Sequence, residues 1–445
     1  MTLFAIGGVE PRPDPPGWST LRLKDATTYV NRGEAPTYAD GETGLLAFNQ
    51  RCIRIDRTID LSFARPITDD LDIDRTSARL RVGDIVINST GTGTLGRAGY
   101  ISSGVLPPDV PVIADGHVTI LRADENVVLG RYMWYLLSTH AFYAVANACL
   151  AVGSTNQMEL GREAIRQLSV AIPPIETQYQ IVSKLDREIE TIARVMAEER
   201  DLGELIRDRR MAEVDRFIEH GGATAIRMQS VESPWIDAIP HNWQLMPLKR
   251  CVAKVTVGIV VTPSRYYEDE GVPVLRGLNV RPGRVTADDL VFMSDASNEL
   301  HSKSRLQQGD VVVVRTGVTG SAAEVPDWAV GGNIVDLLLV RPGPEMRPRF
   351  LELLLNSRLV QRQVLYGSVG ALQAHFNTGA LSNVLVVVPP LPEQDRVLAH
   401  LDDHLARYDR LIVETDRAIR LLVEHRDCLV TDAVTGGAVQ DSQAA

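Results

Sequence analysis

The sequence predicts an α+β protein: two similar mixed α/β domains separated by two long antiparallel helices that form a coiled-coil spacer. The first observation is an internal repeat. The strand, proline pair and glutamine in segment 170–186 recur in segment 386–402, so that Pro173 and Gln178 match Pro389 and Gln394 at one constant offset. A repeat of this size indicates a duplicated structural unit. The second observation is a stripe of apolar residues at alternating steps of three and four after each proline pair, which is typical of helices that pack on one another.

Composition limits the classes of protein that fit. The chain has 445 residues, 23% charged residues and 44% hydrophobic residues, as expected for a globular protein with two to four domains. No apolar run approaches the roughly 18 residues of a membrane helix, and no signal peptide is recognisable, so we expect a cytoplasmic protein without membrane contact. The four cysteines are scattered singly, which predicts reduced thiols. A formal charge of −11 excludes coating of nucleic acid by net charge alone.

Each unit repeats the same series of predicted elements. A short strand opens at Trp18 and at Trp243, an apolar strand follows that ends in Asn-x-Arg, and a Gly-Asp turn then leads into a β-branched run. That run predicts a buried strand, and a loop rich in glycine and threonine follows it. Two more strands, a short helix and the strand into the proline pair complete the unit. We expect a first domain at 1–174 with an extended lead-in to residue 17, a central helix at 175–222, a second domain at 223–390, a C-terminal helix at 391–437 and a flexible tail at 438–445.

The two long helices share the pattern of a helix pair. About 42–45 residues at 1.5 Å each give a rod of roughly 65 Å, and its apolar stripe would face water without a partner. The other long helix is the obvious partner, and Gly221-Gly222 and Gly436-Gly437 are the expected helix ends. The predicted seam consists of Leu185, Ile189, Ile192, Met196, Leu401, Leu405, Tyr408, Ile412, Ile419 and Leu422.

Motifs for catalysis are missing from the sequence. Gly91-Thr-Gly-Thr-Leu-Gly96 is a literal G-x-G-x-x-G, but no helix start follows it and the second copy does not keep it, so a flexible loop is the better interpretation. The sequence has no P-loop, no H-E-x-x-H and no amino-methyltransferase motif. We therefore predict no catalytic residues and no metal ligands in this chain. An enzyme with an unrecognised site stays as an alternative.

Polar residues in the loops of both copies are the best candidates for function. Arginine can bond guanine with two hydrogen bonds, asparagine and glutamine can bond adenine, and threonine can contact base edges or phosphates. The predicted DNA-binding residues are Arg32, Asn49, Gln50, Arg51, Thr90, Thr92 and Arg97 in the first copy, and Arg265, Arg276, Asn279, Arg281, Arg315, Thr316 and Thr319 in the second.

The whole layout resembles the specificity (S) subunit of type I restriction–modification systems. The resemblance rests on the duplicated unit, the two long helices and the family's strand-Pro-Pro-Leu-x-Glu-Gln signature, which is complete at 389–394. The first copy keeps Gln178 but has Thr177 where glutamate is usual.

The resemblance implies a function and a set of partners. Each domain would be a target-recognition domain that reads one half of a bipartite target on double-stranded DNA. The paired helices would fix the gap between the halves and dock two methyltransferase (M) subunits, and restriction (R) subunits would be added for cleavage. S-adenosylmethionine, ATP and magnesium would bind to those partners, and this chain would be non-catalytic and bind no cofactor directly. Alternatives are the same role with a single fused nuclease–methyltransferase partner, and a coiled-coil adaptor that binds only protein.

Overall fold

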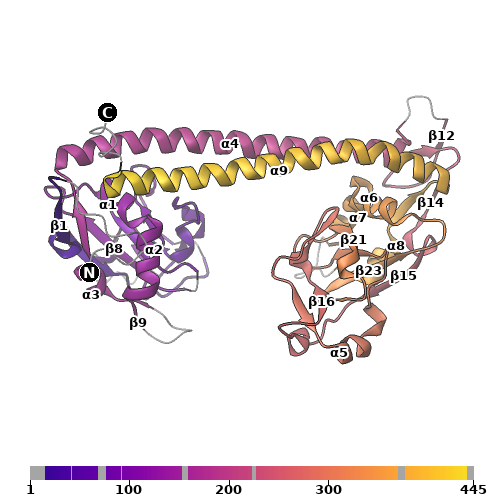
Figure 1. Cartoon of the computed structure of the whole chain (residues 1–445), viewed down its shortest axis with the longest axis horizontal. Coiled ribbons are helices and arrows are strands. Elements are labelled where there is room, and N and C mark those ends of the chain that lie inside the picture. The colour runs from indigo at the N-terminus through magenta and orange to yellow at the C-terminus, as the bar shows by residue number, and fades with distance from the viewer. Residues whose placement is uncertain are drawn as a thin grey trace. The chain divides into compact units, whose positions relative to one another are not determined.

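Figure 1 shows the computed structural model of the chain, in which residues 16–41, 43–68, 77–91, 93–152, 159–222, 227–368 and 376–437 are described. The chain divides into two compact units. Unit 1 comprises 1–199 and 417–445, and unit 2 comprises 200–416. Each unit therefore contains one sheet-rich domain together with a portion of both long helices.

Unit 1 contains a four-stranded antiparallel sheet, a three-stranded sheet and a two-stranded ladder. The four-stranded sheet has the order β2(Thr27–Arg32), β8(Val118–Ala123), β5(Ile85–Asn88) and β6(Ala98–Tyr100). The three-stranded sheet has the order β4(Arg65–Pro66), β3(Leu46–Phe48) and β7(Val112–Ala114), with β3 and β7 parallel. The ladder joins β1(Ser19–Arg22) to β11(Ser169–Ile172), the strand before the proline pair, and a short hairpin pairs β9(Ala151–Val152) with β10(Glu159–Leu160).

Unit 2 repeats this topology. Its four-stranded sheet has the order β15(Val252–Val257), β23(Leu337–Pro342), β20(Val311–Val314) and β21(Ala322–Glu324). Its three-stranded sheet has the order β19(Val291–Met293), β16(Val272–Leu275) and β22(Asn333–Ile334), again with one parallel pair. The equivalent ladder joins β14(Gln244–Pro247) to β24(Leu385–Val388). Unit 2 adds the pairs β12(Met228–Ser230) with β13(Ala238–Pro240), and β17(Val280–Arg281) with β18(Arg284–Val285). The predicted fold class is thus confirmed, and the duplication extends to strand order.

The β-branched run of each copy is the central strand of its sheet. In β20, Val311 and Val313 face one apolar cluster, whereas Val312 faces another. Ile85 and Val86 of β5 are divided between two clusters in the same way. Because successive side chains of a strand point to opposite faces, a strand that is apolar throughout is buried on both faces.

A buried ion pair fixes the turn that enters each central strand. The Asp84 carboxylate accepts two hydrogen bonds from Arg122 at 2.7 and 3.2 Å, and Asp310 accepts two from Arg341 at 2.7 and 2.8 Å. Burial raises the pKa of Asp84, and the bonds from Arg122 oppose that rise. The Gly-Asp pairs of the sequence therefore anchor neighbouring strands to each other.

Short helices cover the sheets, and two long ones connect the units. Unit 1 has α1(Gly130–Leu137), α2(His140–Val145) and α3(Arg162–Gln167), and unit 2 has α5(Asp295–Leu300), α6(Pro348–Asn356), α7(Arg358–Ser368) and α8(Thr378–Asn383). The long helices are α4(Ile175–His220) and α9(Leu391–Thr435). In the described part of the chain, no helix is long and apolar enough to cross a membrane.

The long helices lie side by side and run antiparallel (Figure 1). In unit 2, Arg207 pairs with Asp416 at 3.1 Å, and Arg210 pairs with Asp409 at 2.8 Å, so the numbering of one helix rises as the other falls. Each of the ten predicted seam residues is buried or half-buried. In unit 1, Leu185 of α4 belongs to the same apolar cluster as the end of α9.

The stripe of α4 is interrupted at one point. Leu202 has 45% of its surface exposed, and the neighbouring Gly203 is buried against α9. A Cβ added to Gly203 would lie 3.3 Å from the Thr415 hydroxyl. The absence of a side chain lets the two helices approach closely here, and this turns Leu202 toward solvent.

Candidate nucleic-acid interface

A buried glutamine attaches each domain to its long helix. The Gln178 side chain accepts a hydrogen bond from the Leu129 backbone N–H at 2.8 Å and donates to the Val127 and Pro173 carbonyls. Gln394 makes the equivalent bonds with Arg347, Glu345 and Pro389 at 2.8 Å each. Leu129 and Arg347 directly precede α1 and α6. The repeated glutamine thus locks the first turn of the long helix to the start of a domain helix.

The repeated Leu-Asp pair supplies a second contact at each junction. Asp186 accepts hydrogen bonds from Tyr135 and Arg131 of α1 at 2.5 and 3.0 Å. Asp402 forms an ion pair with Arg349 of α6 at 3.6 Å. Because these contacts orient each domain on its helix, they also orient the domain's loops.

Two loops of unit 1 bring several predicted residues together. One follows β3 and contains Gln50 and Ile53, and the other joins β5 to β6. Arg97 of the second loop donates to the Ile53 carbonyl at 3.1 Å and to the Gly93 carbonyl at 3.4 Å, and Thr94 donates to the Gln50 side chain at 3.4 Å. The described part of the glycine-rich segment is therefore a loop packed on its neighbour, and the strand β6 follows it directly in place of a helix.

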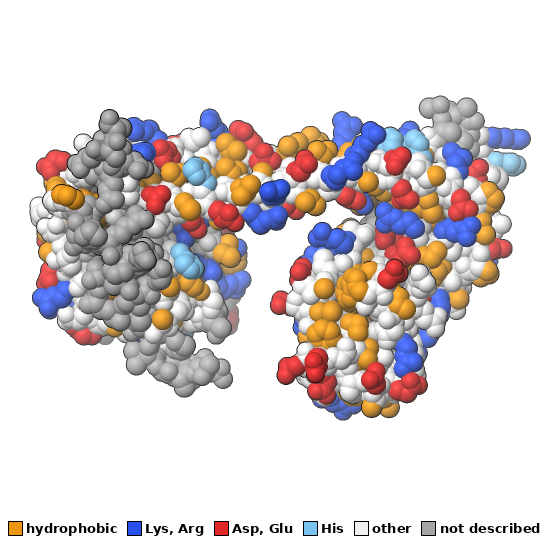
Figure 2. All heavy atoms as spheres, viewed as in Figure 1, with side chains coloured by type: hydrophobic (Ala, Val, Ile, Leu, Met, Phe, Trp, Pro, Cys, Tyr) orange, Lys and Arg blue, Asp and Glu red, His pale blue; other side chains and the backbone are white. Residues whose placement is uncertain are grey.

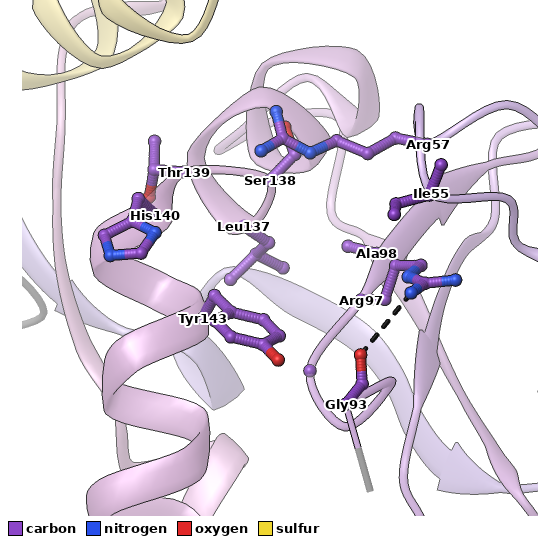
Figure 3. Close-up of a pocket in the computed structure, with 11 residues that line it drawn as sticks. Ile55, Arg57, Gly93, Arg97, Ala98, Leu137, Ser138, Thr139, His140 and Tyr143 are labelled. Carbon is purple, nitrogen blue, oxygen red and sulfur yellow. Dashed lines mark hydrogen bonds between the residues drawn. The ribbon is translucent and has the colours of Figure 1, made fainter. Parts of the chain in front are cut away.

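A pocket of about 250 Å³ lies between these loops and the start of α2 (Figure 3). Arg57, Arg97, His140 and Tyr143 line it, together with the backbone around Gly93. None of the described residues that line it is acidic. A concave surface that carries two arginines and a histidine is suited to an anion or to the acceptor atoms of a base edge.

Other predicted residues of unit 1 are engaged inside the domain. Asn49 is buried, accepts the Arg51 backbone N–H at 2.8 Å and donates to the Phe63 carbonyl at 2.6 Å. Arg32 forms an ion pair with Glu159 at 2.6 Å, and this hydrogen bond lowers the pKa of Glu159.

The remaining residues of the first set differ in exposure. Arg51 is exposed and stacks over the Phe63 ring at 4.9 Å. Thr90 is half-buried and bonds the His117 imidazole at 2.8 Å. Thr92 lies outside the described residues. Arg51 is therefore the exposed arginine of the first set, and Arg97 is half-buried in the pocket wall.

In unit 2 the equivalent asparagine has a structural role as well. Asn279 is fully buried, accepts the Arg276 backbone N–H at 2.9 Å and donates to the Thr286 and Asp288 carbonyls. Asn49 caps the start of the short turn Gln50–Cys52, whereas Asn279 ends the short turn Gly277–Asn279, so each asparagine holds a turn of its own domain. Neither asparagine presents a free amide to a base, and we remove both from the candidate readers.

The other predicted residues of unit 2 lie on four segments. Arg265 is exposed and stacks over Tyr266 at 4.5 Å, and Arg281 is exposed on the β17–β18 hairpin. Arg276 donates to the Asp289 carbonyl. The loop after β20 carries Arg315, Thr316 and Thr319; Arg315 pairs with Asp336 at 3.2 Å, Thr316 is exposed, and Thr319 is half-buried. Gly277 lies against the Thr316 carbonyl, so this loop adjoins the turn at 276–279.

Equivalent positions in the two domains carry different side chains. The residue after the central strand is Ser89 in unit 1, where it bonds Thr119 at 2.5 Å, and Arg315 in unit 2. Two similar backbones with different loop chemistry are suited to reading two different sequences.

Comparison with known proteins gives one group of relatives. The chain is 23% identical over 207 residues to the type I restriction enzyme EcoKI specificity subunit of Escherichia coli strain K12, a match that covers 44% of each chain. It is 20% identical over 325 residues to the EcoBI specificity subunit of Escherichia coli, which covers 69% of this chain and 66% of that one. No family model matches.

A solved structure extends the likeness to nearly the whole fold. A chain from a study of complex assembly and conformational transition of the type I R-M system covers 95% of this chain and 99% of its own length, with a TM-score of 0.61 and 18% sequence identity. The chain is thus similar in sequence and in fold to type I restriction specificity subunits. The first curated relative is matched over less than half of its length.

Sequence reasoning missed Arg57, His140 and Tyr143 of the pocket. Arg57 has a left-handed backbone (φ 70°) and forms an ion pair with Asp427 of α9 at 3.3 Å. Burial lowers the pKa of Arg57, and Asp427 opposes that effect. His140 and Tyr143 lie on α2, a helix of six residues that is too short to show an apolar period in the sequence. These residues reach the pocket from segments distant in sequence, so no local signal could have found them.

Proposed function

We propose that this chain is the DNA sequence-recognition subunit of a type I restriction–modification complex and that each domain reads one half of a bipartite target. The observation that carries the proposal is the pair of domains with one topology and different loop side chains, each anchored by the same glutamine to one of two antiparallel helices. The domains would correspond to 1–174 and 223–390, and the helices to 175–222 and 391–437. The DNA duplex fixes the distance and the helical phase between two half-sites. Two domains that read both half-sites must therefore be held at a fixed spacing.

The base readers would come from the residues whose polar groups stay accessible. In the first domain these are Arg51, Arg97 and the residues of the pocket, and in the second they are Arg265, Arg281 and the loop after β20. Arginine is the side chain that most often distinguishes guanine in the major groove. Partner subunits would supply much of the phosphate neutralisation, which agrees with the formal charge of −11 on this chain.

The long helices would dock two methyltransferase subunits, with restriction subunits added. Apolar side chains remain exposed on both helices, at Leu202, Leu205, Leu411, Val413 and Leu421. Figure 2 shows apolar side chains on the exposed surface of the helix pair. Exposed apolar surface of this kind is typical of a protein–protein contact. S-adenosylmethionine, ATP and magnesium would bind to those partners in the cytoplasm, and this chain would carry out no catalysis itself.

Methylome sequencing of the host with and without this gene tests the proposal. We expect one split motif, two specified halves around an unspecified gap, to lose its methylation when the gene is deleted and to regain it on complementation. An unchanged methylome would contradict the proposal and favour an adaptor that binds only protein. Methyl transfer or DNA cleavage by the purified chain alone would instead indicate an enzyme. A single fused nuclease–methyltransferase partner would appear as one neighbouring gene in place of separate M and R genes.

A further inference from the structure

Two histidines and a glutamate meet on the helix pair within unit 2. His400 and His404 lie one helical turn apart on α9, and Glu213 reaches them from α4. One possible ligand atom from each residue lies within 4.8 Å of the other two. Residues four apart share one face of a helix, so both imidazoles project toward the same place. Figure 2 shows histidine side chains at the surface of the helix pair among acidic and basic ones.

The contacts within this cluster hold the three groups close. His404 Nδ1 lies 3.7 Å from Glu213 Oε1, and the two imidazole rings stack at 4.6 Å between centroids with 28° between their planes. Phe217 of α4 packs on the His400 ring at 4.6 Å. His400 is exposed, and Glu213 and His404 are half-buried, so an ion can reach the cluster from solvent.

We propose that Glu213, His400 and His404 form a Zn²⁺ site that ties α4 to α9. Two imidazole nitrogens and one carboxylate oxygen form a ligand set that zinc uses, with water in the fourth position of a tetrahedron. Histidines at positions i and i+4 of a helix are a known arrangement for two zinc ligands. The sequence predicted no metal ligands, because the spacing His-x-x-x-His alone lacks the third residue, which comes from the other helix. The proposal concerns the helix pair and is independent of the DNA-recognition role.

One cation already competes for the glutamate. Arg216 donates to Glu213 Oε1 at 2.9 Å from the next turn of α4, and 47% of the Arg216 side chain is exposed. Ion pairs this exposed are weak. A zinc ion can therefore bind the second carboxylate oxygen or displace the guanidinium. Removing Arg216 should strengthen zinc binding if the site is the one proposed.

Zinc titration of the full-length chain, freed of metal with a chelator, tests the site. We expect calorimetry to give one high-affinity Zn²⁺ per chain, and Co²⁺ in its place to give the visible absorption of a tetrahedral nitrogen–oxygen site. His404→Ala and Glu213→Gln should each raise the Kd by at least about tenfold, since even residues that only support metal ligands cost 10–100-fold. Arg216→Ala should lower it. His425→Ala is the matched control, because His425 is exposed on the same helix outside the cluster, and it should bind zinc like the unaltered chain.

Thermal unfolding tests whether zinc bound between α4 and α9 stabilises the folded protein. A ligand that binds only the folded protein raises its Tm, so added zinc should raise the Tm of the unaltered chain and of His425→Ala, and leave that of His404→Ala unchanged. Circular dichroism without metal checks that the variants keep their helices. The proposal is overturned if the unaltered chain binds no zinc, if His404→Ala binds it as tightly as His425→Ala does, or if zinc raises the Tm of all three chains equally.

Discussion

At the scale of residues, the glutamine of each junction is the clearest structural determinant. Gln178 is fully buried, and all three of its hydrogen bonds go to backbone groups of its own domain. Removing the partner of a buried backbone N–H or carbonyl costs free energy, because that group then has neither water nor protein to bond. The junction therefore depends on an amide that can both donate and accept.

Replacing this glutamine should destabilise the protein measurably. We expect Gln178→Ala to lower the free energy of unfolding of its unit by about 3 kcal/mol, the order of cost for buried polar groups left unsatisfied. Urea unfolding followed by circular dichroism measures the change. Gln167→Ala is the control, since Gln167 is exposed and its side chain bonds the exposed Glu163, and it should stay within about 0.5 kcal/mol of the unaltered chain. Equal effects of the two substitutions would refute the role of the junction.

Arg97 is the residue of the first domain that we most expect to touch DNA. Its guanidinium lines the pocket and is held by two backbone carbonyls, so its remaining N–H groups are oriented in advance. Arg97→Ala should weaken recognition at one position of the first half-site by about 1–3 kcal/mol. Binding of the assembled methyltransferase complex to a panel of single-base variants measures this. Arg22→Ala, which removes an exposed arginine paired with Asp25, should leave binding unchanged, and relaxed recognition in the second half-site would count against the assignment.

At the scale of elements, periodicity and turn chemistry predicted most of the fold. The central strands, the long helices and the strand before each proline pair lie where the sequence indicated them, because each has a regular apolar pattern. The six-residue helices α2, α3, α5 and α8 were not predicted, since elements this short carry too few turns to show a period. The eleven-residue helix α7 was not predicted either. The strand-like run at 333–340 is divided into β22 and β23, and Asp336 between them adopts a left-handed backbone with φ 50°.

The candidate site was harder to predict than the fold. The sequence pointed to Asn49 and Asn279 because they recur, but both side chains are buried and hold backbone groups of local turns. Arg57 and His140 do not recur, yet both line the pocket. Two domains that read different sequences must differ at the residues that contact bases. A search for residues shared by the two copies therefore misses those positions.

The helix pair makes its own prediction about the target. Inserting one turn of four residues in both helices, after Val195 in α4 and after Arg420 in α9, should change the length of the unspecified gap and leave both half-sites intact. Each turn adds about 6 Å to the helix axis. Methylome sequencing of a strain that carries the longer chain gives the result directly. A changed base within either half-site, with an unchanged gap, would contradict the role of the helices as a spacer.

At the scale of the whole molecule, we propose that the chain contains two independent readers. Each unit has its own sheets and its own apolar clusters, and each domain is attached to its helix by its own glutamine and aspartate. Contacts that decide the bases should therefore be confined to one domain at a time. This independence is the central claim, because an adaptor, an enzyme or a single composite site would not need it.

Exchange of one domain tests this claim most directly. Residues 243–388, from the opening strand β14 through β24, are replaced by the matching segment of a related specificity subunit whose target is known, and the methylome of the host is sequenced. We predict a new motif that keeps one original half-site and the original gap and takes its other half-site from the donor. Loss of specificity in both halves, or retention of the original motif, would contradict the account.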